Sequence, residues 1–401
     1  MRSIRQAFFR YGWLLPAWLP LAQVGGRALF NVLAGIYFLW GLAALIRTPI
    51  VVSRGVVILY VLLLLSMTAG ALGAQDSERA LRKLMVFFSH SMAFFFTLMV
   101  LQRSARRVGG LMKTFAVAAC LLIALLYVQL GYLIWHEPFA PGLQLREDNL
   151  PFMAPILFFV ICRAGRRWPV RGVAAATVLG LVTLYVLVSG GRAALLGLLV
   201  AASVYLLTVL RRRWYEIAAI AVLAGALAFT LGGDRWLRQF PPESPDGSSG
   251  WMQRLDQFTS HRLSLWRQAL QHAPANPWLG VGIGNARYTE QIMQTTPGQH
   301  VKHLHNFALD AWYETGALGV ALLLGLLGVL FAAGWQADRR LPPGARAYAG
   351  VLLSSAAAIV AAALFSFSYG SNPFSFYLFV VLAALYALYQ RSQHSGGSPL
   401  R

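Results

Sequence analysis

Ionisable and amide side chains stand at the start of an apolar stretch that is long enough to cross a membrane. The segment HNFALDAWYETGALG (305–319) runs directly into VALLLGLLGVLF. Asn306, Asp310 and Glu314 follow one another at intervals of four residues, so a helix would place them along one line, about 100° from His305. An imidazole that titrates near neutral pH can take a proton from an alcohol, which makes His305 the candidate catalytic base.

The neighbours of His305 have different explanations. His303 lies two residues before it, and neither histidine has an evident packing role at the start of a membrane helix, which favours contact with a ligand. Buried Asp310 and Glu314 instead suit pairing with arginines that fix how the helix packs, because charges inside a span cost several kcal/mol unless they are paired. We expect His305 to carry the chemistry and the two acids to support it.

A second candidate is the turn VSGGRAALLGLL (188–199), where Arg192 opens a helix directly after Ser189 and two glycines. A cation opposes the positive end of the helix dipole, and a bound anion would compensate for it. Free backbone N–H groups, glycines and a guanidinium together suit a phosphate. The alternative is an arginine that anchors the span at the membrane interface.

Further cations lie in two other segments. Arg262 and Trp266 are one helical turn apart, and the alternative to a binding role is a solvated basic face. Arg79, Arg82 and Lys83, within ERALRK (78–83), are weaker candidates for contact with an anionic substrate. The chain lacks CxxC, HExxH and Walker A patterns, so no metal site and no cofactor are predicted.

These residues must be positioned by membrane helices, because 58% of the chain is hydrophobic and only 12% is charged. Apolar runs of the length that crosses a bilayer recur about twelve times. The fold class predicted is therefore an all-α integral membrane protein with about twelve transmembrane helices. The expected spans are 11–24, 28–46, 55–74, 84–101, 111–135, 150–162, 168–188, 191–210, 214–232, 305–333, 346–367 and 373–390.

The formal charge of +20 is spread over alternate loops, which argues against nucleic acid as a partner. Loops assigned to one side carry most of the Arg and Lys and only two acids, Glu216 and Asp338. By the positive-inside rule these loops and both termini are cytoplasmic.

One long polar segment divides the chain. The predicted organisation is transmembrane helices 1–9 in 1–232, a large outer loop in 233–304, transmembrane helices 10–12 in 305–390 and a cytoplasmic tail in 391–401. Apolar residues at helical intervals predict one amphipathic helix over 251–272 at the membrane interface, and the glycines of 276–288 predict a turn that reorients the chain.

Two of these motifs carry a resemblance to a known family. His305-Asn306, nine residues, Gly316, two residues and Gly319 resemble the signature of the O-antigen ligase family (WaaL). RLSLW (262–266), followed by PWLGVGIGN (277–285), resembles the loop of that family and its wider clan, which includes O-antigen polymerases and protein O-oligosaccharyltransferases. The specific motifs occupy 189–192 and 262–319.

The resemblance implies a metal-independent, GT-C-like glycosyltransferase with one large periplasmic loop. Such a ligase moves O-antigen glycan from undecaprenyl pyrophosphate to the lipid A-core oligosaccharide, on the periplasmic side of the bacterial inner membrane. Arg192 and Arg262 would bind the donor pyrophosphate. His305 would orient or deprotonate the acceptor hydroxyl. The expected partners are the lipid-linked glycan, the lipid A-core and membrane lipids.

Other functions remain open at the level of sequence. An O-antigen polymerase could share every motif, whereas a protein O-oligosaccharyltransferase is disfavoured because no added domain follows the last span here. A transporter of lipid-linked oligosaccharide would explain the spans and the outer arginines, but it would not explain a His-Asn pair at a helix mouth opposite a long loop.

Overall fold

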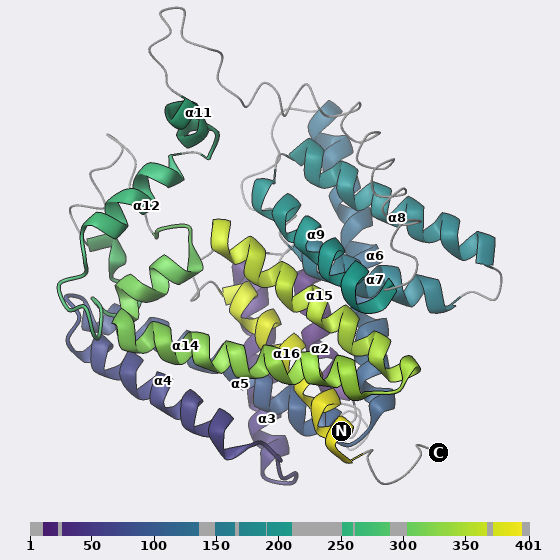
Figure 1. The fold of residues 1–401 in the computed structure, drawn as a ribbon, viewed down its shortest axis with the longest axis horizontal. Helices are drawn as coiled ribbons and strands as arrows, with labels where there is room; N and C mark the ends of the chain where they lie inside the picture. The colour runs from purple at the N-terminus through teal and green to yellow at the C-terminus, as the bar shows by residue number, and fades with distance from the viewer. Residues whose placement is uncertain are drawn as a thin grey trace, which may run out of the picture.

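The computed structural model describes residues 11–22, 26–135, 149–164, 168–189, 191–210, 251–259, 261–288, 303–366 and 372–394, and these residues form helices joined by loops, without strands. Figure 1 shows the helices packed together, with α11 and α12 lying beyond the end at which α14 begins. The longer elements are α2 (Leu15–Ala22), α3 (Arg27–Leu45), α4 (Arg54–Leu72), α5 (Ser77–Leu101), α6 (Ala105–Trp135), α7 (Leu150–Ala164), α8 (Trp168–Ser189), α9 (Arg192–Tyr205), α11 (Trp251–Phe258), α12 (Arg262–Gln271), α14 (Phe307–Arg340), α15 (Pro343–Ser366) and α16 (Asn372–His394).

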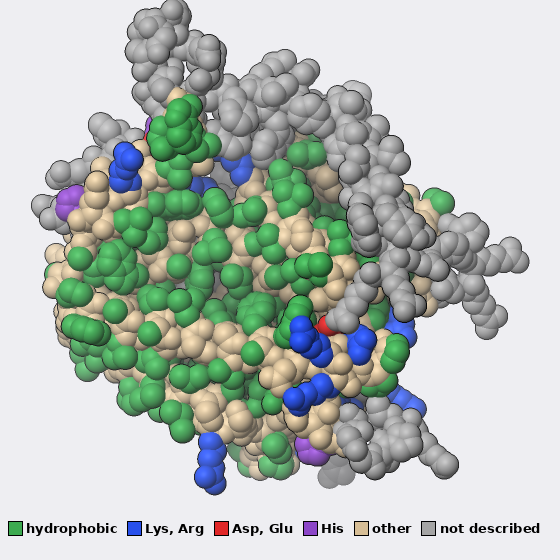
Figure 2. Space-filling model, in the orientation of Figure 1, with side chains coloured by type: hydrophobic (Ala, Val, Ile, Leu, Met, Phe, Trp, Pro, Cys, Tyr) green, Lys and Arg blue, Asp and Glu red, His purple; other side chains and the backbone are tan. Residues whose placement is uncertain are grey.

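The described helices confirm an all-α membrane protein. Nine of them are long and apolar enough to cross a bilayer, and two shorter apolar helices, Gly12–Ala22 and Leu150–Arg163, lie where the spans 11–24 and 150–162 were predicted. The predicted span 214–232 lies outside the described residues. Apolar side chains cover most of the face in Figure 2, and the basic side chains gather toward opposite edges, as expected for a surface with a central lipid belt.

The core is centred on α15 and α16. Both helices are largely buried, and α16 packs against α5, α14 and α15. Tyr377 and Phe376 of α16 contact Phe30 of α3 edge to face. Small residues line α15 where α9 crosses it, so the two backbones approach closely, as is common between membrane helices.

The register between α9 and α15 runs antiparallel. A Cβ on Gly350 would lie 2.8 Å from the Thr208 hydroxyl, and a Cβ on Gly197 would lie 3.2 Å from the Ala358 carbonyl. Between these points, Ser354 donates a hydrogen bond to the Ala201 carbonyl. Because residue numbers fall along α9 as they rise along α15, Arg192 at the start of α9 lies toward the end of α15.

The helix α14 is broken near its start by Gly316, whose φ of 65° and ψ of −174° are accessible essentially only to glycine. The segment 276–282 packs directly into this break. Two of its amides donate to α14 carbonyls, and two α14 amides donate to its carbonyls. The four bonds are Val281 N to Tyr313 O at 2.9 Å, Gly282 N to Glu314 O at 3.0 Å, Ala317 N to Pro277 O at 2.8 Å and Leu318 N to Trp278 O at 3.3 Å.

This contact explains the glycines of the loop. A Cβ on Gly280 would lie 2.5 Å from the Glu314 backbone, and a Cβ on Gly316 would lie 2.3 Å from the Trp278 carbonyl. The backbone N–H and C=O groups at the break thus form hydrogen bonds with the segment 276–282. A break within a membrane helix requires such partners, because the bilayer core offers none. The predicted turn over 276–288 is present, and its glycines serve close backbone approach.

Several predicted boundaries were wrong, among them the start of the span 111–135, which belongs to α6 and begins at Ala105. The helix predicted from residue 305 begins at Phe307 and continues to Arg340. The single amphipathic helix predicted over 251–272 is two helices, α11 and α12, separated at His261, whose φ is 60°. The span predicted from residue 84 begins at Ser77, which brings the ERALRK segment into α5.

Candidate active site

The helix α12 is held against the start of α14 by a small apolar core of its own. Leu265 and Ala269, one turn apart, are buried with Leu304, Tyr313 and Ala286. The Tyr313 hydroxyl also donates a hydrogen bond to the carbonyl of His272 at the end of α12. This packing fixes the rotation of α12 and determines where its polar residues lie.

Arg262 and Trp266 share the next face of α12 and dock on the end of α15. Arg262 donates from Nη1 to the Phe365 carbonyl, and the Trp266 ring meets the Phe365 ring edge to face at 5.5 Å. The Trp266 indole N–H donates to the Leu304 carbonyl at 2.9 Å. The predicted one-turn spacing of Arg262 and Trp266 is therefore present, and both residues link the loop to the membrane helices.

The corner before α12 is set by Asp256. Its carboxylate accepts hydrogen bonds from the Ser264 backbone at 2.8 Å and from the His261 ring at 3.1 Å. Burial raises the pKa of Asp256, but the bonds from Ser264 and His261 outweigh burial and hold this pKa below its ordinary value. A charged carboxylate at this corner orients the first turn of α12, where Arg262 stands.

His305 and Asn306 precede α14 instead of forming its first turn. Asn306 is the N-cap, and its side-chain oxygen accepts from Ala308 N at 3.0 Å and Leu309 N at 3.1 Å. The N-cap residue has an extended backbone, so the helix begins only after it. His305 precedes the N-cap, lies outside the helix and has a left-handed φ of 54°. The imidazole is thus presented by a short turn.

His303 packs directly on His305. The two rings lie 4.0 Å apart between centroids, and the His305 backbone N–H donates to His303 Nδ1 at 3.3 Å. A ring nitrogen that accepts a hydrogen bond carries no proton. The structure therefore places an unprotonated His303 nitrogen against the strained turn that presents His305.

Both histidines are kept neutral. Burial first, and then the positive charge of Arg262, lower the pKa of His305, while its hydrogen bond to the Ser366 backbone acts in the opposite direction. Burial and the nearby cationic groups lower the pKa of His303 to about 3. His305 Nδ1 is buried and makes no hydrogen bond to any described residue. A neutral imidazole of this kind can accept a proton.

Asp310 and Glu314 are both buried, at 0% and 4% exposure. The Asp310 carboxylate accepts a hydrogen bond from the Leu304 amide at 2.8 Å, which ties the histidine turn down onto α14. The backbone carbonyl of Glu314 accepts a hydrogen bond from the backbone N–H of Gly282 at the helix break. The acids therefore lie in the wall of the site, with Asp310 bonded to the turn backbone.

Arg192 opens α9 after Gly191, as predicted, and is half-buried. The antiparallel register of α9 and α15 brings it toward the end of α15. Phe365 and Ser366, at that same end, contact Arg262 and His305. The fold thus brings Arg262 and His305 to one helix end from distant parts of the chain, and the register of α9 directs Arg192 toward the same end.

Arg79 and Arg82 have different surroundings on the first turns of α5. Arg79 donates from Nε to the Gly284 carbonyl at 3.0 Å and so fastens the glycine loop. Arg82 is exposed and pairs with Glu78 at 3.4 Å, a surface ion pair of little energetic weight. The side chain of Asn285 completes this fastening by bonding both the N–H and the carbonyl of Asp76, at 3.0 and 3.2 Å.

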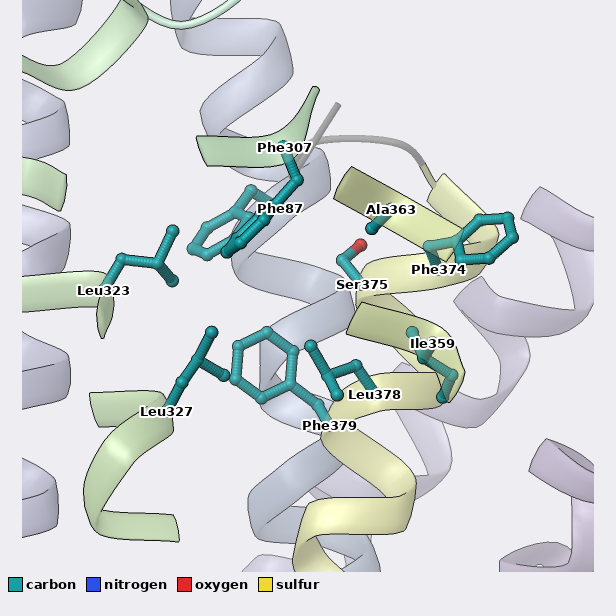
Figure 3. A pocket seen from close by; sticks show the side chains of 10 residues that line it. All are labelled: Phe87, Phe307, Leu323, Leu327, Ile359, Ala363, Phe374, Ser375, Leu378 and Phe379. Carbon is teal, nitrogen blue, oxygen red and sulfur yellow. The ribbon is translucent and has the colours of Figure 1, made fainter. Parts of the chain in front are cut away.

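A narrow apolar crevice of about 30 Å³ lies between α5, α14, α15 and α16. Figure 3 shows its lining side chains converging from these helices, with Phe307 and Phe87 at one end and Leu327 and Phe379 at the other. Phe307 is the second residue after His305, and Ala363 of the lining is the second residue before Phe365. The crevice therefore begins beside the histidine turn.

Two further residues lie at the site without having been predicted. Arg287 acts electrostatically on His303, and the backbone of Ser366 bonds to His305. A signal for the histidine turn was present, because Asn is among the preferred N-cap residues and directly follows His305. Nothing local pointed to Ser366, which meets the site only through the packing of α15.

Comparison with known proteins bears on one part of the chain. Residues 178–324 match the family model described as O-Antigen ligase. The comparison with curated proteins gives no match. The matched segment spans the start of α9, both loop helices, the histidine turn and the broken helix. The predicted O-antigen ligase resemblance is thus confirmed over residues 178–324, the part of the chain that holds Arg192, Arg262 and His305.

Proposed function

We propose that the protein is an O-antigen ligase that transfers a glycan from undecaprenyl pyrophosphate to a sugar hydroxyl of the lipid A-core. The observation that carries the proposal is the meeting of Arg262 and a neutral His305 at the end of α15. A cation for the leaving group and a base for the incoming alcohol are the two groups that this transfer needs.

In the proposed reaction, the acceptor hydroxyl attacks the anomeric carbon of the donor sugar. A C–O bond forms to the acceptor, the bond to the pyrophosphate oxygen breaks, and undecaprenyl pyrophosphate leaves with the bonding electrons. His305 takes the hydroxyl proton. Arg262 and Arg192 stabilise the negative charge that grows on the pyrophosphate, which two guanidinium groups are well suited to do.

The remaining predicted site residues have supporting roles in this scheme. His303 and Asp310 hold the turn that carries His305, and Asn306 caps the helix that follows it. Trp266 positions Arg262 by packing on Phe365. Glu314 supports the wall of the site through the hydrogen bond that its backbone carbonyl accepts at the helix break. Arg79 and Arg82 were predicted as possible contacts to an anionic substrate. In our proposal Arg79 holds the glycine loop in place, and Arg82 is a surface residue.

The apolar crevice suits the lipid part of the donor. Its lining is apolar apart from the Ser375 hydroxyl, and it begins two residues from His305. A polyprenyl chain that enters there leaves its pyrophosphate at the histidine turn. We propose that the first isoprene units of undecaprenyl pyrophosphate lie against this crevice.

The proposed setting is the bacterial inner membrane, with a GT-C-like arrangement of helices. Both termini lie in the cytoplasm, and residues 233–304 form a periplasmic loop over the active site, in agreement with the distribution of Arg and Lys along the sequence. The site would then lie on the periplasmic side, where the loop helices α11 and α12 meet the membrane helices.

A deletion strain tests this function against its closest rival. Loss of a ligase leaves lipid A-core without any O-antigen while lipid-linked glycan accumulates. Loss of an O-antigen polymerase leaves lipid A-core that carries a single repeat unit, and that product would overturn the ligase assignment. A transporter is tested with purified protein in detergent, since only an enzyme joins donor to acceptor without a membrane to cross.

A further inference from the structure

One buried amide joins the glycine loop to the start of α5. The side chain of Asn285, a residue that is 1% exposed, pairs with the backbone of Asp76. Its oxygen accepts from the Asp76 N–H at 3.0 Å, and its nitrogen donates to the Asp76 carbonyl at 3.2 Å. A buried amide with either group unpaired would destabilise the fold. Asn285 therefore holds the loop to Asp76 through both of its polar groups.

Asp76 is itself fixed in place. It is the N-cap of α5, and one carboxylate oxygen accepts a hydrogen bond from the Arg79 N–H at 2.9 Å. The other oxygen accepts from the hydroxyl of Tyr288, at the end of the short helix η5 (Ala286–Tyr288), at 3.0 Å. Residues 285–288 are thus bonded at both ends to the first turn of a membrane helix.

The residue after Asn285 belongs to the small core that carries the histidine turn. Ala286 is buried in one cluster with Leu265 of α12 and with Leu304. On the other side of Asn285, Ile283 is buried in the main core among the membrane helices. Asn285 therefore lies where the glycine loop passes from one core to the other.

Leu304 links this small core to the candidate base, because His305 is the next residue. The backbone amide of Leu304 donates to the Asp310 carboxylate, and its carbonyl accepts from Trp266. Its fully buried side chain packs in the cluster that contains Ala286. Leu304 is thus held by α14, by α12 and by the loop. Loss of the loop contact would let the turn rotate about the other two, which would displace the His305 ring.

We propose that Asn285 is a positioning residue for the transfer: its bonds to Asp76 hold Ala286 against Leu304, and so hold the His305 ring in line with the acceptor hydroxyl. This inference rests on the proposed function, because it gives Asn285 a part in presenting the base. Arg262 has a separate attachment, since it is bonded to a carbonyl at the end of α15. The bonds of Asn285 therefore act on the base and leave the cation for the pyrophosphate in place.

Steady-state kinetics of the purified protein test this role. Asn285→Ala removes both bonds, and Asn285→Asp keeps the shape but places an acceptor opposite the Asp76 carbonyl. Both variants should lower kcat at least about tenfold, because a displacement of about 1 Å can cost about a hundredfold in rate. KM for the lipid-linked donor should stay within about twofold of the wild type, because Arg262 is retained. Wild-type kcat in both variants would overturn the proposal.

The matched control is Tyr60→Phe, which removes a different buried hydrogen bond, from α4 to Ser91 of α5 at 2.7 Å. This bond lies within the membrane helices and is not part of the contacts that lead to His305. Tyr60→Phe should lower the melting temperature, as Asn285→Ala does, and leave kcat at the wild-type level. An equal fall of kcat in the control would mean that the rate follows stability alone, against the proposal.

A double-mutant cycle separates positioning from a general structural role. If Asn285 acts through His305, its effect should vanish when the imidazole is absent. Asn285→Ala should therefore reduce the residual rate of His305→Ala by less than about twofold. Losses that multiply in the double variant would assign Asn285 another role.

Hydrogen exchange records the same effect without turnover. The amides of Leu304 and His305 are bonded to Asp310 and His303, and in Asn285→Ala they should exchange at least about tenfold faster than in the wild type. Tyr60→Phe should leave their exchange unchanged. Wild-type exchange of both amides in Asn285→Ala would overturn the inference. Absence of transfer by the wild-type protein would contradict the ligase function instead, so the two failures are distinguishable.

Discussion

Replacing Gly316 by alanine should unfold the junction on which the site is built. The added Cβ would lie 2.3 Å from the carbonyl carbon and oxygen of Trp278. The segment 276–282 must then move away, and at least the two bonds from Ala317 and Leu318 are lost, at about 1 kcal/mol each. Forcing alanine into this glycine-only backbone region costs about 1–3 kcal/mol more. The expected destabilisation is therefore on the order of 3–5 kcal/mol.

The assay is thermal unfolding of the purified protein in detergent, followed by tryptophan fluorescence. The matched control is Gly328→Ala on the same helix, where a Cβ meets nothing within 4 Å. Because alanine favours a helix interior over glycine by up to about 1 kcal/mol, the control should melt at or above the wild-type temperature. A wild-type melting temperature for Gly316→Ala would refute the argument that the loop plugs the helix break.

Three further predictions concern the histidine turn and the crevice. His303 has a lower pKa in the folded protein, about 3, than in the unfolded chain, so stability should be lost as the pH falls from 6.5 toward 3. His303→Asn, which keeps an acceptor for the His305 amide but does not titrate, should lose less melting temperature between pH 7 and pH 5 than the wild type. The plot of kcat/KM against pH should rise to a plateau with an inflection below pH 6.5, because burial and Arg262 lower the pKa of His305. The residual activity of Arg262→Gln should show its inflection at a higher pH. An inflection at the wild-type pH in this variant would contradict the assignment. Ala363→Trp should fill the crevice and raise KM for an undecaprenyl donor and for a farnesyl-length donor alike, because both carry the first isoprene units. An unchanged KM for both donors would contradict the proposed lipid position.

The apolar runs were sufficient to predict most of the helices, because a membrane span needs a length of apolar chain that few other structures need. The positions where helices end depended on single residues. The helix α14 begins two residues later than the apolar pattern indicated, because the side chain of Asn306 caps its start. The amphipathic spacing continued through His261, where the Asp256 corner separates α11 from α12.

The site could be predicted as a set of residues but not as an arrangement. His305, Arg262 and Arg192 stood out locally, by type and by position at a turn or helix start. The contact between Arg262 and Phe365 joins residues 103 positions apart, and nothing near either one indicates it.

The break at Gly316 was hidden for a related reason. One glycine within an apolar helix is ordinary in a membrane protein, and only the approach of residues 276–282 makes its left-handed conformation necessary. The glycines of GVGIGN and the glycine of the ETGALG segment are two sides of one backbone contact. A sequence pattern can mark each side, but it cannot show that the two sides meet.

The central claim is that His305 takes the proton of the acceptor hydroxyl while Arg262 holds the leaving pyrophosphate. It is tested most directly by mixing purified protein with lipid-linked glycan and lipid A-core in detergent. The wild type should join the two, and His305→Ala should reduce the rate by at least about a hundredfold, the usual contribution of a general base, with donor binding unchanged. Wild-type transfer by His305→Ala would contradict the account.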